Sequence, residues 1–98
     1  MTIKKIENGD ELTIALEGRL DTTTAPELDD MLKTTLGSVK ELNFDFSKLE
    51  YISSAGLRVL LSAQKVMNKQ GSMLVKNVGE EIKEIFEVTG FTDILNIE

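Results

Sequence analysis

The sequence predicts an α/β fold in which a mixed sheet of about four strands carries helices chiefly on one face. Segments with apolar residues at every second position alternate with segments of helical spacing, and short turns separate them. The resulting order is β-β-α-β-α-β-α, in which each β-α-β unit makes a right-handed crossover between parallel strands. The 98 residues correspond to one domain over 1–98.

Four segments are expected to form strands. The first, Thr2–Glu7, is weakly patterned and fits an edge strand, and the turn signal Asn8-Gly9-Asp10 makes it half of a hairpin. Clean alternation in the next two strands places leucine, isoleucine and phenylalanine side chains on one buried face. These two strands and the last one are expected at Glu11–Glu17, Glu41–Ser47 and Met73–Lys76.

Three amphipathic helices follow from the remaining pattern. The first starts at Thr24, which is expected to cap it, with Glu27 three residues on and Pro26 in the first turn. The second opens at Ser53-Ser54 and closes at Gly71. The last helix and the segment after it, a short turn with a candidate final strand, are expected at 80–90 and 91–97.

Composition excludes several functions. The net charge of −6, from 17 acidic and 11 basic side chains, disfavours nucleic acid and anionic membrane surfaces as partners. The absence of histidine and cysteine removes Ser-His-Asp and Cys-His catalysis, so we expect a protein that is not an enzyme and needs no cofactor or metal. Without a signal-peptide or transmembrane stretch, a cytoplasmic location is the default.

The most informative stretch is Ser53-Ser54-Ala55-Gly56, where a strand passes into a helix. One interpretation is that either serine is an ordinary N-cap, accepting a free amide of the first turn. The other is that the two serines and the small residues after them leave the N-terminus of the helix, here called the helix mouth, open for a phosphate. Free amides and the helix dipole both favour anions at this position. The spacing alone leaves both open.

Two motifs resemble those of STAS-domain anti-sigma factor antagonists. The segment Tyr51–Arg58 is similar to the Asp-Ser-(Ser/Thr/Ala)-Gly-Leu element that opens a helix in that family. Gly18-Arg19-Leu20-Asp21, followed by Thr24-Ala25, resembles the family's Gly-x-(Leu/Ile)-Asp turn before the first helix. The order of elements matches as well, so the resemblance spans essentially the whole chain.

The resemblance implies a switch. In that family an anti-sigma factor serine kinase of the GHKL type phosphorylates the serine that corresponds to Ser54, and a PP2C-type phosphatase removes the phosphate. The unphosphorylated form binds the kinase and thereby frees a sigma factor. Ser53 departs from the family, which usually has Asp there. The implied partner-binding residues are Gly18, Asp21, Thr22, Ser53, Ser54, Ala55, Gly56 and Arg58.

Alternatives remain at two points. Asp21 is also explained as an ordinary turn residue before Thr22-Thr23-Thr24. Similar domains also serve, without phosphorylation, as accessory or scaffold subunits of transport complexes, and the serine at position 53 keeps that function in consideration.

A monomer or a weak dimer is expected, because an edge strand can pair between copies.

Overall fold

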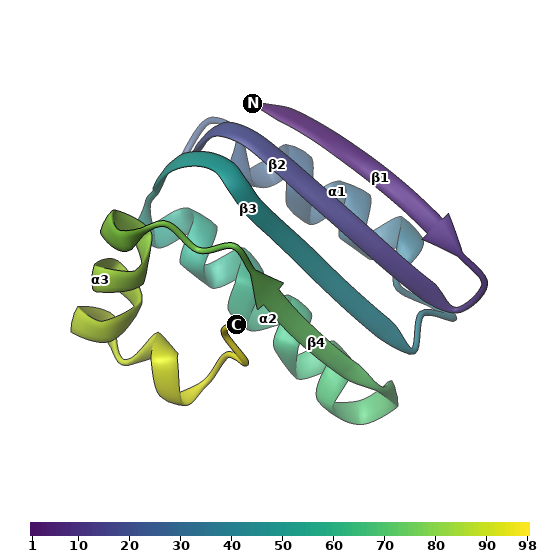
Figure 1. Ribbon diagram of the computed structural model, residues 1–98. Helices are drawn as coiled ribbons and strands as arrows, with labels where there is room; N and C mark the ends of the chain where they lie inside the picture. Colours follow the sequence, from purple (N-terminus) through teal and green to yellow (C-terminus); the bar gives the residue numbers. More distant parts are fainter.

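The computed structural model describes residues 1–98 and contains one four-stranded sheet of order β1-β2-β3-β4 (Figure 1). Strands β1 and β2 are antiparallel, and β2-β3 and β3-β4 are parallel. The predicted mixed sheet with an initial hairpin is therefore confirmed. The elements are β1 (Thr2–Asn8), β2 (Glu11–Leu20), α1 (Ala25–Thr35), β3 (Glu41–Ile52), α2 (Ser54–Gln70), β4 (Ser72–Lys76), α3 (Glu80–Thr89) and a short 3-10 helix, η1 (Phe91–Asp93).

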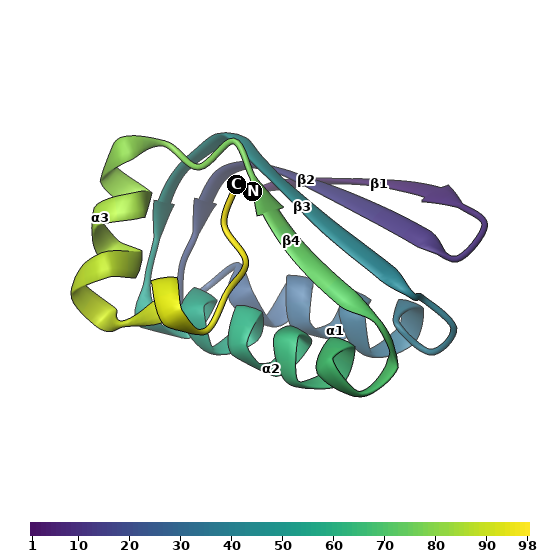
Figure 2. The same cartoon turned by 60° about the horizontal axis from the view of Figure 1, so that its bottom comes forward.

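Helices α1 and α2 cover one face of the sheet, and α3 stands at one end of it (Figure 2). The side chains of Leu12, Ile14 and Leu16 on β2 are essentially inaccessible, as are those of Leu42 and Phe44 on β3. This alternation places the hydrophobic core between the sheet and the two helices, as the period of two predicts. None of the helices combines the length and the apolar character needed to cross a bilayer.

Strands β2 and β3 run further than the sequence predicts. The expected ends were Glu17 and Ser47, but pairing continues to Leu20 and Ile52. The register shifts twice along this pair, so that β3 contributes extra residues. The buried positions of β3 consequently change from a spacing of two to a spacing of three: Leu42, Phe44, Phe46, then Leu49 and Ile52. A strict period of two cannot detect a strand beyond its first bulge.

The C-terminal part of the chain packs against the second half of β3, beyond the end of its pairing with β4. Phe86 of α3 is fully buried, and its ring centroid lies 6.5 Å from that of Phe46. The candidate final strand is reduced to a single parallel bridge between Ile97 and Val75. The Val75 amide donates to the Asn96 carbonyl at 2.8 Å. Helix α3 therefore covers a stretch of β3 that β4 is too short to reach.

We expect Phe86→Ala to lower the free energy of unfolding by about 3–5 kcal/mol, because it removes a fully buried ring and leaves a cavity. Val88→Ala is the matched control on the same helix, since that side chain is 79% exposed, and it should change stability by less than about 0.5 kcal/mol. Urea unfolding followed by circular dichroism measures both. Equal effects of the two substitutions would contradict the packing of α3 on β3.

Candidate functional site

The start of α2 is tied to the end of β2. Ser53 occupies the N-cap position with an extended backbone, φ −99° and ψ 176°. Its amide donates a hydrogen bond to the Leu20 carbonyl at 2.9 Å, and its carbonyl accepts one from the Leu57 amide at 2.9 Å. The same residue thus closes the β2-β3 pairing and opens the helix.

The two serines have different environments. The Oγ atom of Ser53 is inaccessible to solvent and has no hydrogen-bond partner, and no side chain caps α2. Ser53 is therefore the N-cap by position but not by side-chain bonding. Ser54, the first residue of the helix, is exposed. Of the two hydroxyl groups, that of Ser54 is the one open to another protein.

The electrostatics at this helix mouth favour an anion. The first turn of α2 has no acidic side chain, so no carboxylate of that turn neutralises the positive end of the helix dipole. Arg58 is exposed one turn into the helix. Arg19, at the end of β2, lies over the Tyr51 ring with its Cζ atom 4.2 Å from the ring centroid. A phosphate on Ser54 would meet free amides and no carboxylate of its own helix.

Gly56 permits the close approach of α2 to the sheet. A Cβ atom added there would lie 2.7 Å from Leu20 Cγ and 2.9 Å from Ile52 Cγ1. Both neighbours are core side chains that are at most 2% exposed, so they have little room to move. Gly56 is itself buried, and it serves the site by holding the helix mouth against the ends of β2 and β3.

Asp21 organises the turn between β2 and α1. Its Oδ1 atom accepts hydrogen bonds from Thr23 Oγ1 at 2.7 Å, the Thr23 amide at 3.0 Å and the Thr24 amide at 3.2 Å. Its carbonyl accepts one from the Ala25 amide at 2.8 Å. Arg19 Nε lies 3.7 Å from the other carboxylate oxygen. The turn interpretation of Asp21 is thus confirmed, whereas its contact with a partner stays a prediction.

The expectation that Thr24 caps α1 is wrong. Thr24 has the N-cap position, but its side chain makes no cap bond. Its hydroxyl instead donates to the Arg19 carbonyl at 2.8 Å and accepts a hydrogen bond from the Asp21 amide at 2.8 Å. The Asp21 carboxylate accepts hydrogen bonds from the amides of Thr23 and Thr24, which precede α1, and the Asp21 backbone carbonyl accepts one from the first helical amide, that of Ala25. The Thr24 hydroxyl is thus engaged within the turn and does not bond to the helix amides.

Gly18 stands apart from the helix mouths. Its φ of +98° lies in the region that favours glycine, and it sits at the second register shift between β2 and β3. Its role is to let β2 bend, so that Leu20 and Asp21 reach α1 and α2. Neither of the two cavities described below includes Gly18.

A shallow groove of about 250 Å³ joins the starts of α1 and α2. It brings together three of the predicted residues, Thr22, Ala55 and Arg58. Of the others, Asp21, Ser54 and Gly56 are next to lining residues in the chain, whereas Gly18 and Ser53 are not. The sequence does not mark the remaining lining residues as partner-binding residues; they are Ala25, Pro26, Asp29, Val59 and Ser62. No spacing rule could find them, since the groove exists only where two helices pack side by side.

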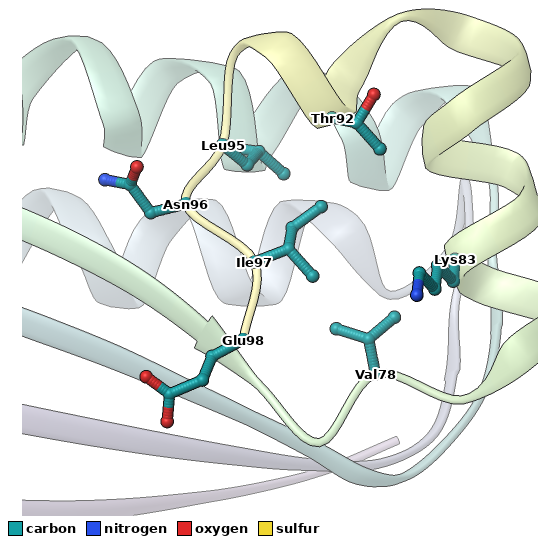
Figure 3. A pocket seen from close by; sticks show the side chains of 7 residues that line it. All are labelled: Val78, Lys83, Thr92, Leu95, Asn96, Ile97 and Glu98. Atoms are coloured by element: carbon teal, nitrogen blue, oxygen red, sulfur yellow. The ribbon is translucent and has the colours of Figure 1, made fainter.

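A second cavity, of about 490 Å³, lies between α3 and the C-terminal segment (Figure 3). The side chains of Val78, Leu95 and Ile97 line it, with Lys83 on the α3 side. It shares no residue with the groove between α1 and α2. Its polar groups do not converge on a point, which distinguishes it from a built ligand site.

Comparison with known proteins relates this sequence and fold to one family. A family model described as STAS domain matches residues 2–98. The anti-sigma-B factor antagonist of Bacillus subtilis is 28% identical over 92 residues, covering 93% of this chain and 84% of that protein. The anti-sigma-B factor antagonist of Listeria monocytogenes is 32% identical over 98 residues, covering 96% and 84%. The structure of the Bacillus cell fate determinant SpoIIAA in the phosphorylated form has a TM-score of 0.78 at 17% identity, covering 99% and 91%.

The sheet order and the helices on one face define a SpoIIAA-like α/β fold. With the family match over residues 2–98 and relatives above 30% identity, the chain belongs to the STAS domain family, among proteins named anti-sigma factor antagonists. The resemblance drawn from the two sequence motifs is confirmed at this level.

Gly56→Ala should destabilise the fold by about 1–3 kcal/mol, because the added methyl group overpacks the contact with Leu20 and Ile52. Gly37→Ala is the control, since a Cβ atom there meets nothing within 4 Å. Thermal unfolding of both variants measures the difference. A Gly56→Ala protein as stable as Gly37→Ala would show that the helix mouth does not press on the sheet.

We expect the pKa of the Asp21 carboxyl to lie below its usual 3.8, chiefly because Thr23 Oγ1 donates a hydrogen bond to it. An acid with a lowered pKa stabilises the folded state above its ordinary pKa, and this contribution is lost as the pH falls through the lowered value. NMR titration of Asp21 should show the pKa rising in Thr23→Val. Thr22→Val, which removes no hydrogen bond to Asp21, should leave it unchanged, and an equal rise in both would refute the assignment.

Proposed function

We propose that this protein is a phosphorylation-controlled binding module that antagonises an anti-sigma factor, with Ser54 as the phosphate acceptor. One observation carries the proposal: Ser54 is exposed at the first position of a long helix, while the neighbouring Ser53 hydroxyl is inaccessible. A kinase that approached this helix mouth would therefore find one acceptor, not two. The similarity to relatives named anti-sigma-B factor antagonists supports the same class of function.

The helix mouth suits a reversible phosphate. Phosphorylation adds roughly −1.5 to −2 charges, and the dipole and free amides of the first turn of α2 stabilise that charge. The switch therefore acts through the surface offered to a partner, without unfolding the helix. This agrees with the likeness of the fold to SpoIIAA in the phosphorylated form.

The proposed partner of the unphosphorylated form is an anti-sigma factor serine kinase of the GHKL type, whose capture frees a sigma factor. The binding surface is the groove between the starts of α1 and α2, lined by Thr22, Ala55 and Arg58, together with the acceptor Ser54, which precedes Ala55 in the chain. A PP2C-type phosphatase resets the protein. A carboxylate beside the acceptor is absent because position 53 is Ser, so the cognate kinase must recognise the acceptor through other groups.

Incubation with a cognate GHKL-type kinase and ATP should add one phosphate, measured by intact-mass spectrometry and located by fragmentation at Ser54. Ser54→Ala should abolish the addition, whereas Ser53→Ala should retain it, because the Ser53 hydroxyl is not accessible. Equal labelling of the Ser54→Ala protein would exclude Ser54 as the acceptor. Co-purification with transport ATPase components in place of a kinase would favour the accessory-subunit alternative.

The switch itself is tested by binding. Ser54→Glu should weaken kinase binding on the order of tenfold or more, because a charge introduced beside the groove must be desolvated or opposed when the partner binds. Ser54→Gln is the matched control of equal size without the charge and should bind more tightly than Ser54→Glu. Isothermal titration calorimetry gives both affinities. Equal affinities for the two variants would show that charge at this position does not control the partner.

A further inference from the structure

The outer edge of β1 is the uncovered edge of the sheet. Strand β1 pairs with β2 alone, and six of its seven residues are exposed. Exposed edges with free backbone groups are templates for pairing with another strand. The residues along this edge determine which strand can pair there.

The direction of the backbone groups follows from the register. The Asp10 carbonyl, just before β2, accepts hydrogen bonds from the amides of Lys40 and Glu41 at the start of β3. The even-numbered residues of β2 therefore direct their backbone N–H and C=O groups toward β3, and the odd-numbered residues direct theirs toward β1. The odd-numbered residues of β2 pair with the even-numbered residues of β1, such as Ile6 with Thr13. Because bonding alternates along an antiparallel strand, Ile3, Lys5 and Glu7 turn their backbone groups outward.

The side chains at this edge carry opposite charges. Lys5 and Glu7 lie on the helix-bearing side of β1, opposite Ile14 and Leu12 of β2. Their charged groups are 3.5 Å apart and their side chains are 40% and 64% exposed. Between them, Ile6 lies on the other side of the strand and is 62% exposed. The edge thus has one lysine, one apolar residue and one glutamate in succession.

This pattern complements itself in one register. Two copies of β1 can pair antiparallel only where outward-facing residues meet outward-facing ones. In such a pair the two-fold axis passes through one residue of the strand Thr2–Asn8. At least five residues of each copy are paired only when that residue is Lys4, Lys5 or Ile6. An axis at Lys4 or Lys5 sets two lysines directly against each other, which is destabilising. An axis at Ile6 sets Lys5 of each copy opposite Glu7 of the other.

We propose that this protein self-associates through β1, antiparallel and centred on Ile6, to form a continuous eight-stranded sheet. Each copy offers its four strands, Lys5 and Glu7 of one copy exchange backbone hydrogen bonds with Glu7 and Lys5 of the other, and the two Ile6 side chains meet on the open face. The axis is perpendicular to the sheet, so both pairs of helices lie on the same side. Because β1 contributes nothing to the groove between α1 and α2, the dimer presents two free Ser54 sites.

Cross-linking tests the register. The chain has no cysteine, so one introduced thiol reports one position. Ile6→Cys should form an intermolecular disulfide at least tenfold faster than Lys4→Cys under mild oxidation. The two residues at position 6 form a non-hydrogen-bonded pair with Cα atoms about 4.5 Å apart, within disulfide range. Residue 4 of one copy is about four residues along the strand from residue 4 of the other, roughly 14 Å.

Lys5→Cys distinguishes the competing register, in which the axis passes through residue 5. If it cross-links as fast as Ile6→Cys, the proposed register is wrong. If all three thiols cross-link at the same slow rate, the contact is random collision and the dimer does not exist. Attachment of a different protein to the edge would give no self-linked product from any of the three.

Charge exchange tests the ion pairs. Sedimentation equilibrium up to about 1 mM should show a rise in average mass with concentration for the original protein. Lys5→Glu and Glu7→Lys should each weaken dimerisation about tenfold, since each turns two opposed pairs into like-charged ones. The double variant, with both substitutions, should regain dimerisation to within about threefold. Unfolding curves confirm that the monomers remain equally folded.

The single variants also exclude a simple effect of net charge. From the net charge of −6, Lys5→Glu gives −8 and Glu7→Lys gives −4, so general repulsion predicts opposite changes in affinity. The proposed register predicts that both weaken it. Stronger dimerisation of Glu7→Lys, no rescue in the double variant, or a mass that stays monomeric at 1 mM would each overturn the proposal.

Discussion

The hydrogen bond from the Ser53 amide to the Leu20 carbonyl is the constraint on which the candidate site depends. It holds the end of β2 against the residue at which β3 becomes α2. Gly56 supports this junction, because the absence of a side chain lets the helix approach Leu20 and Ile52. Together they fix the direction of the first turn of α2, and this direction places Ser54 outward and the Ser53 hydroxyl inward.

The two bulges between β2 and β3 serve the same junction. Pairing continues through them past Glu17 and Ser47 to Leu20 and Ile52, directly before the turn at Asp21 and the start of α2. The bulges lengthen and bend the pair, and Gly18 supplies the positive φ that the second shift uses. Asp21 then orders the turn into α1. The groove between the two helix starts is a consequence of this geometry.

The free edge of the sheet, along β1, differs from the helix starts in its side chains. There the residues of β1 are mostly exposed, and their charges alternate around one apolar side chain. The sheet thus separates two surfaces: one at the helix starts, suited to a partner and a phosphate, and one at β1, suited to a second copy. The two surfaces have no residue in common, so the residues of each can be substituted separately.

The sequence by itself determined the order of elements, the buried face of each strand and the position of the serine motif, because periodicity and helix-start residues are local properties of the chain. It did not determine the ends of β2 and β3, the use of the Thr24 hydroxyl within the turn in place of a cap on α1, or which serine is open to solvent. Those depend on register shifts and on side chains that meet only after folding. Ser53 and Ser54 are adjacent and chemically identical, and only the packing of α2 on the sheet distinguishes them.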